Sequence, residues 1–168
     1  MKKFLSVLFL SSALVLTGCG DTAETPEETT EDTTTEETAS GELQDGTYRI
    51  EELNYGETGW REALEMTVEG GEITDANFES VNEEGVNKIE DDEYQEAMAN
   101  VTEIGPQDFI PELEDQVANM SDPSDVEVVS GATSTSEKVQ EWAQELYAAA
   151  QEGNTETIEV DNQVEDAE

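Results

Sequence analysis

Histidine is absent from this sequence of 168 residues, and cysteine occurs once. Without histidine the chain cannot form a Ser-His-Asp or Cys-His nucleophile pair, and it offers no imidazole as a metal ligand. A single cysteine excludes an internal disulfide, a CxxC redox pair, a CxxCH haem attachment and a cysteine-ligated iron-sulfur cluster. The side chains therefore supply little redox or nucleophilic chemistry of their own.

Basic residues are also scarce: six lysines and arginines stand against 44 acidic residues, a formal net charge of −38. Nucleic acid is not an expected partner, because its binding depends on basic side chains that neutralise phosphates. The hydrophobic fraction of 35% is below the roughly 45–50% typical of globular domains, so we expect part of the chain not to fold. One domain is expected from the remainder.

The first 19 residues have the organisation of an export signal. Lys2 and Lys3 form a short positive segment, residues 4–16 are mostly apolar, and small residues precede Cys19. This pattern resembles a bacterial lipoprotein signal, so we expect removal of residues 1–18 and attachment of membrane lipid to the Cys19 thiol. The expected location is the extracytosolic face of the cell membrane. An uncleaved membrane anchor, or an ordinary signal peptide with a coincidental cysteine, is the alternative.

Two acidic segments flank a patterned middle region. Residues 19–42 are almost entirely Glu, Asp, Thr and small residues, which have little to bury and whose like charges repel. We expect a disordered linker there, one domain over residues 43–152 and an acidic tail over residues 153–168. A short edge strand at residues 157–160 is the alternative to a mostly disordered tail. Removal of residues 1–18 would leave a formal charge of −40.

The first part of the middle region alternates polar and apolar residues. Residues 45–50 form a turn and an alternating segment, residues 60–68 carry apolar side chains at period two, and residues 73–78 alternate again. Gly70 and Gly71, between the last two segments, are typical of a tight hairpin turn. The pattern predicts an antiparallel β meander.

The second part changes to helical spacing. Residues 94–101, 109–117 and 139–150 have apolar positions three or four residues apart. Residues 126–129 are expected to form a brief strand, and a Ser-x-x-Glu capping box at residues 134–137 is expected to start the last helix. The predicted fold class is α+β: an antiparallel meander packed with helices, with a small-residue turn at a helix N-terminus.

That turn has the sequence Ser130-Gly131-Ala132-Thr133-Ser134-Thr135-Ser136. Backbone amides at a helix start are unpaired and carry the positive end of the helix dipole, so an anion beside Thr133 or Ser134 would be stabilised. Lys138 is the only cation nearby in the sequence. A capped turn that binds nothing is the alternative, and the spacing alone favours it.

The same string resembles the flavinylation motif of the FMN-binding domain family. That family includes one subunit each of the sodium-translocating NADH:quinone reductase and of the Rnf complex, together with extracytosolic flavin lipoproteins of Gram-positive bacteria. Upstream segments also match the family pattern: Asp45-Gly46-Thr47-Tyr48, Gly59-Trp60, residues 67–74 and Asp92-Glu93-Tyr94. The resemblance covers residues 45–150.

The resemblance implies that an FMN transferase joins FMN to Thr133 through a phosphoester. Gly131 and Ala132 would leave room for the backbone to approach the phosphate. Where the family pattern has aspartate three residues before the serine, this chain has Glu127, and Asp125 would lie on the same face of the expected strand. The cofactor-binding residues implied are Ser130, Gly131, Ala132, Thr133, Ser134 and Thr135.

An isoalloxazine ring needs a flat apolar wall, for which Trp60, Tyr94 and Trp142 are the aromatic candidates. Trp142 lies on the apolar stripe of the last helix and Tyr94 begins an apolar helical face, so both are expected in the core. Trp60 follows a glycine at the start of a strand, and it is the residue we predict to contact the ring, with a core position as the alternative.

The function implied is that of a membrane-anchored, extracytosolic electron carrier with covalent FMN, and not of an enzyme that turns over a substrate. No metal site is expected. The implied partners are the FMN transferase, a quinone-linked electron donor in the membrane and an external electron acceptor. The alternative is an acidic surface lipoprotein without flavin that binds cations or the cell wall.

Overall fold

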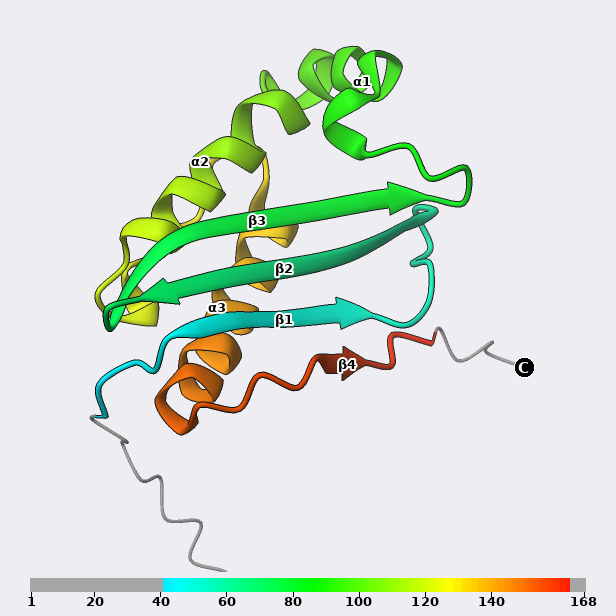
Figure 1. Cartoon of the computed structure of the whole chain (residues 1–168). Coiled ribbons are helices and arrows are strands. Elements are labelled where there is room, and N and C mark those ends of the chain that lie inside the picture. Colours follow the sequence, from blue (N-terminus) through cyan, green and yellow to red (C-terminus); the bar gives the residue numbers. More distant parts are fainter. Residues whose placement is uncertain (1–40, 164–168) are drawn as a thin grey trace, which may run out of the picture. The chain divides into compact units, whose positions relative to one another are not determined.

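The computed structural model describes residues 41–163, and Figure 1 shows how their elements are arranged. The expected signal peptide, Cys19 and nearly all of the acidic linker lie outside these residues, as does the end of the acidic tail. Within the described part of the chain, no helix is long and apolar enough to cross a membrane.

A four-stranded sheet has the order β3-β2-β1-β4. β1 (Gly46–Glu52), β2 (Trp60–Glu69) and β3 (Glu72–Asn82) are antiparallel neighbours, which confirms the predicted meander. Gly70 and Gly71 turn the chain between β2 and β3 with φ values of 65° and 80°. Positive φ at both positions is what a two-residue hairpin of type I′ requires.

The fourth strand follows the last helix. β4 (Ile158–Val160) runs parallel to β1 at the edge of the sheet, with Ile158 opposite Ile50. The edge-strand alternative for this segment is therefore confirmed, and the sheet continues past residue 152, where the sequence pattern placed the end of the domain. The helices between β3 and β4 provide the long connection that a parallel neighbour needs.

Three α-helices in the described region, α1 (Asp92–Thr102), α2 (Pro106–Asn119) and α3 (Thr133–Glu152), lie where the helical spacing predicts them. Figure 1 shows α2 alongside β3, and α3 behind β1 and β2. Residues from one face of the sheet and from α2 and α3 form the core. Its members include Tyr48, Ile50, Leu64, Met66, Phe78, Phe109, Ile110, Leu113, Val117, Val139, Trp142 and Leu146.

The predicted strand at residues 126–129 is wrong. This segment is extended but joins no sheet, although Val126 and Val129 are buried. Side chains pair with its backbone instead: the amide of Glu127 donates to Gln116 Oε1, and the carbonyl of Val126 accepts from Gln140 Nε2. Because neighbouring helices satisfy these groups, the segment needs no strand partner.

Candidate functional site

The turn before α3 brings the predicted string to the surface. Gly131 has a φ of 92°, and a Cβ added there would lie 2.9 Å from Ile104 Cγ1 and 3.0 Å from the Thr102 carbonyl oxygen. Glycine is therefore required for both its backbone angle and its close approach to the end of α1. Ala132 is buried after it, and Thr133 begins α3 with an exposed side chain.

The predicted capping box at residues 134–137 does not form. The N-cap is Ala132, which has no side-chain acceptor, so Ser134 already lies in the first turn of α3. Ser136, which is fully buried, holds the turn: its Oγ accepts from the Val129 amide at 3.0 Å and donates to the Ala132 carbonyl at 2.9 Å. The helix therefore starts earlier than a serine cap at position 134 would require.

Three successive amides at this helix start have no acceptor in the described part of the chain. They belong to Thr133, Ser134 and Thr135, whereas the Ser136 amide makes the first bond of the helix, to the Ala132 carbonyl at 2.9 Å. Because α3 is 20 residues long, its dipole adds positive potential to these amides. The start of α3 can therefore accept an anion.

A pocket of about 550 Å³ opens beside these amides. Its lining joins the string to the ends of other elements: Thr58 before β2, Glu62 in β2, Lys88 in the short 3-10 helix η1 (Lys88–Glu90), and one side of α1. The complete lining is Thr58, Glu62, Lys88, Tyr94, Met98, Thr102, Gly131, Ala132, Thr133, Ser134, Thr135 and Lys138.

Of the predicted site residues, Gly131 to Thr135 line the pocket, whereas Ser130 and Trp60 are not part of its lining. Trp60 is buried, and its ring contacts that of Tyr94 edge-on with centroids 5.4 Å apart. Tyr94 is not in the core, where its place on the helical face predicted it, but is half-buried and provides the aromatic surface of the pocket, while the buried Trp60 packs behind it. Trp142 packs against Phe78 within the core, as its place on the helical stripe predicts.

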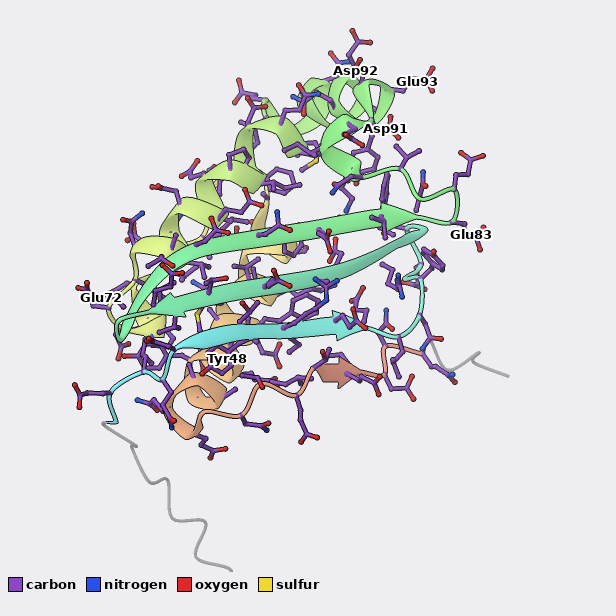
Figure 2. The ribbon with its side chains drawn as sticks, in the orientation of Figure 1. Tyr48, Glu72, Glu83, Asp91, Asp92 and Glu93 are labelled. Atoms are coloured by element: carbon purple, nitrogen blue, oxygen red, sulfur yellow. The ribbon has the colours of Figure 1, made fainter. Side chains whose placement is uncertain are left out.

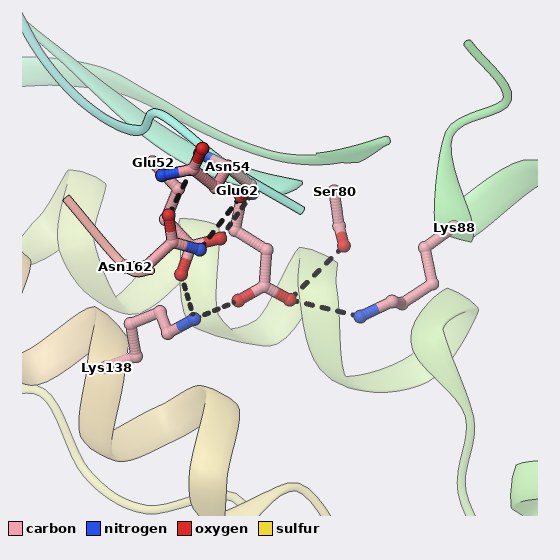
Figure 3. Close-up of polar contacts among 7 residues, drawn as sticks. All are labelled: Glu52, Asn54, Glu62, Ser80, Lys88, Lys138 and Asn162. Carbon is pink, nitrogen blue, oxygen red and sulfur yellow. Dashed lines mark hydrogen bonds and ion pairs between the residues drawn. The ribbon is translucent and has the colours of Figure 1, made fainter. Parts of the chain in front are cut away.

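The polar side of the pocket is formed by Glu62, Lys88 and Lys138. Together with Glu52, which lies behind them, they make an ionic cluster of four residues (Figure 3). Glu62 lies at its centre, because Oε1 accepts from Lys88 Nζ at 3.0 Å and Oε2 accepts from Lys138 Nζ at 2.7 Å. Lys138 also donates to Glu52 Oε1 at 2.6 Å. The cluster is formally neutral, so its two carboxylates are compensated inside the fold.

The cluster changes the acidity of its members. Burial opposes ionisation of Glu62, but the charges of Lys88 and Lys138 outweigh it, and the pKa of Glu62 is lowered. Burial likewise opposes the charge of Lys138, yet its contacts with Glu62 and Glu52 raise its pKa. Burial, with the charges of Glu62 and Asp91, raises the pKa of Tyr94. At neutral pH Glu62 and Lys138 are therefore charged, and the hydroxyl of Tyr94 is protonated.

Basic charge is otherwise almost absent from the surface. Four basic residues fall within residues 41–163, and two of them, Lys88 and Lys138, line this pocket. Figure 2 shows acidic side chains such as Glu72, Glu83 and Glu93 pointing outward from turns and helix starts. Over the described residues, most of the acidic surface therefore repels an anionic ligand, whereas the unpaired amides at the start of α3 favour one.

Asp125 does not share a strand face with Glu127, because no strand forms there. Asp125 ends the 3-10 helix η2 (Pro123–Asp125), and its Oδ2 accepts from the amides of Ser121 and Asp122 at 2.9 and 3.0 Å. Glu127 is exposed beside the turn. The carboxylate of Asp125 is therefore bonded within its own turn and is not placed to substitute for the aspartate that the family pattern has at the position of Glu127.

A family model, a curated protein and a solved structure are similar to this chain. The profile of the FMN-binding domain matches residues 59–148. The 15 kDa lipoprotein of Treponema pallidum (strain Nichols) is 32% identical over 116 residues, which make up 69% of this chain and 82% of that protein. The crystal structure of the CPE2226 protein from Clostridium perfringens superimposes with a TM-score of 0.67 at 34% identity, covering 72% of this chain and 99% of that chain.

Proposed function

We propose that this chain, which belongs to the FMN-binding domain family, is a lipid-anchored, extracytosolic electron carrier with FMN attached to Thr133 through a phosphoester. The observation that carries the proposal is the pocket beside α3. There an exposed threonine hydroxyl, three unpaired amides and two lysines meet in an otherwise acidic molecule.

The start of α3 fits the phosphate of FMN. An ester at Thr133 would lie next to the free amides of Ser134 and Thr135, which can donate to its oxygens. The missing Cβ of Gly131 keeps this turn tight against Thr102 and Ile104. Hydrogen bonds from amides need no lysine cluster, which suits a chain with so few basic residues.

The rest of the pocket fits a flat, mostly apolar ring with a polar end. Tyr94 and Met98 of α1 supply the apolar side, and the ionic cluster supplies the polar side. FMN would supply the electron transfer itself, a chemistry for which the described side chains offer no group. The protein's part is to hold and orient the ring and to fix the charges around it.

Attachment needs a hydroxyl and an activated donor. The Thr133 Oγ–H bond is replaced by a P–O bond to FMN taken from a flavin nucleotide with a pyrophosphate linkage, and the proton leaves with the displaced nucleotide. No electrons are gained or lost in this step, and an FMN transferase is the expected catalyst. The exposed position of Thr133 at the first residue of α3 supports access to the hydroxyl.

The proposed location rests on Cys19, which lies outside the described residues. The N-terminal pattern predicts a lipid on its thiol, and the similar Treponema pallidum protein is itself named a lipoprotein. We therefore propose that electrons pass from a quinone-linked donor in the membrane, through the FMN, to an external acceptor.

Mass spectrometry of the mature chain, produced together with an FMN transferase, tests the proposal. We expect a mass gain equal to one FMN less one water. A flavin that is present but washes out under denaturing conditions would leave only a noncovalent carrier. A chain that holds no flavin at all would favour the acidic surface lipoprotein that binds cations or cell wall.

A further inference from the structure

We propose that Lys88 binds the ring of the flavin, donating a hydrogen bond from the polar side of the pocket to the carbonyl groups of the isoalloxazine. This inference rests on the proposed function and adds a specific residue to it. Neither the string before α3 nor the spacing of the sequence pointed to this lysine, which lies 45 positions before Thr133.

The position of Lys88 is unusual for a lysine. The residue is only 6% exposed, although lysine is rarely buried in proteins unless it is paired. Its side chain reaches the pocket, where its Nζ lies 5.0 Å from the ring centroid of Trp60 and 5.5 Å from that of Tyr94. The two aromatic rings therefore hold the ammonium at the wall of the cavity.

The hydrogen bonds of Lys88 are incomplete. An ammonium has three N–H donors, and Glu62 Oε1, at 3.0 Å, is the one acceptor that the described residues supply. A buried donor without an acceptor is costly, and the pocket is the space from which an acceptor can come. A ligand with carbonyl oxygens would satisfy the remaining donors.

Lys138 differs in this respect. Its Nζ is held by Glu52 Oε1 and Glu62 Oε2 at 2.6 and 2.7 Å, and its side chain is 33% exposed. Two carboxylates thus take up the charge of Lys138, whereas Lys88 shares one oxygen of Glu62 with Ser80 Oγ, which donates to it at 3.2 Å. Of the two lysines, Lys88 has more bonding capacity left for a ligand.

Reversible binding provides the test. In a Thr133→Val background, which removes the attachment hydroxyl, FMN and lumiflavin are titrated by flavin fluorescence. Lumiflavin has the same ring but no phosphate. We expect Lys88→Met to weaken both ligands by a similar factor of about tenfold or more, the effect of one charge-assisted hydrogen bond.

Arg49→Met is the matched control. It removes the same charge, but Arg49 pairs with Glu51, Glu65 and Glu79 and does not line this pocket. Its effect on lumiflavin is expected to be less than about threefold, because Arg49 lies outside the pocket lining and salt largely screens charges at a distance. Unchanged lumiflavin binding by a folded Lys88→Met protein would overturn the proposal for Lys88.

Two further measurements keep the outcomes separate. Lys88→Met could unfold because Glu62 loses a partner. In that case the lumiflavin affinity of the double variant Glu62→Gln/Lys88→Met, which removes both charges, is measured instead. We expect the same loss of affinity, taken relative to Glu62→Gln alone. If the wild-type chain, produced with an FMN transferase, gains no flavin, the proposed function itself fails, a result distinct from lumiflavin binding that is insensitive to Lys88.

Discussion

Gly131 has a positive φ and almost no free space around its Cα. The nearest atoms to an added methyl group would be Ile104 Cγ1 at 2.9 Å and the Thr102 carbonyl oxygen at 3.0 Å, and one of them is backbone. Gly85 has a similar φ of 79° but open space around it. Alanine variants at the two glycines therefore separate the loss of stability caused by the backbone angle from the loss caused by steric contact.

Gly131→Ala is expected to destabilise the protein more than Gly85→Ala does. Both variants carry the cost of a left-handed alanine, about 1 kcal/mol, and only Gly131→Ala adds a clash with the end of α1. Denaturant unfolding of the two variants measures the difference. Equal free energies of unfolding would show that the close approach of the turn to Thr102 does not constrain the site.

Ser136 gives a second prediction at this scale. Ser136→Ala leaves the buried Val129 amide without its acceptor, at a cost of about 1–3 kcal/mol. Ser134→Ala is the control, because Ser134 is exposed and caps nothing. The free energy of unfolding should fall for Ser136→Ala and hardly change for Ser134→Ala. A larger loss of stability for Ser134→Ala than for Ser136→Ala would instead support the capping box that the sequence pattern predicts.

At the scale of elements, the ionic cluster ties four segments together. Glu52 comes from the end of β1, Glu62 from β2, Lys88 from η1 and Lys138 from α3. The Glu52 carboxylate also accepts from the Glu62 amide at 2.9 Å, which fixes the ends of the two strands to each other. The cluster thereby positions α3, and with it Thr133, over the edge of the pocket.

Glu62→Gln should cost about 3 kcal/mol at pH 7, because it leaves the buried Lys88 without its carboxylate partner and Lys138 with one carboxylate fewer. The pKa of Glu62 is lowered in the fold, so its contribution is complete above its ordinary pKa of 4.5 and is lost as the pH falls through the folded value. The stability difference between wild type and variant should therefore shrink in acid.

Denaturant unfolding at neutral and acidic pH measures this difference. Glu112→Gln, at an exposed position of α2, removes the same charge and serves as the control. A difference between wild type and Glu62→Gln that stays constant from neutral to acidic pH would show that Glu62 is not stabilised as a carboxylate.

The elements themselves were largely predictable from the sequence. Alternation, the Gly70-Gly71 turn and helical spacing identified three strands and three helices, because these signals are local. The strand predicted at residues 126–129 was wrong, since Val126 and Val129 are buried while Val128 is exposed, and Gln116 and Gln140 bond to the backbone of the segment. Local patterns do not reveal which distant side chains will bond to a segment.

The candidate site was also predictable only in part. The string from Gly131 to Thr135 was found by its resemblance to a motif, whereas Lys88, Glu62 and Met98 are brought to it by the fold. A lysine between an asparagine and an isoleucine, with acidic residues close by, has the pattern of an exposed position. Its burial beside Trp60 and Tyr94 depends on how η1 packs against the sheet, which no short stretch of sequence encodes.

The net charge of the whole molecule sets the electrostatic potential around the proposed flavin. Forty-four acidic residues produce a negative potential that favours hydration and keeps anions away. The neutral ionic cluster and the start of α3 form a local exception to it. Because acidic residues outnumber basic ones 44 to 6, the surrounding potential is expected to oppose uptake of electrons by a bound flavin.

The midpoint potential of the bound flavin is therefore expected to depend on the salt concentration. The midpoint potential of the bound flavin should be lower than that of free FMN at low ionic strength. It should rise as salt is added, because the Debye length falls from about 30 Å at 0.01 M to about 3 Å at 1 M. Spectroelectrochemical titration in both buffers, with free FMN as the reference, measures it. A potential above that of free FMN that falls with added salt would contradict the expectation.

The proposed attachment of FMN depends on one oxygen atom, that of the Thr133 side chain. Thr133→Val removes this hydroxyl at nearly constant shape, and Thr135→Val, two residues further along the same turn and also lining the pocket, is its matched control. Both variants are produced with an FMN transferase, and intact-mass and peptide mass spectrometry locate any flavin.

We predict that wild type and Thr135→Val each gain one FMN less one water on the peptide that contains residue 133, and that Thr133→Val gains nothing. A flavin still attached to Thr133→Val, or one lost from Thr135→Val while Thr133 is intact, would contradict the assignment of Thr133 as the attachment site.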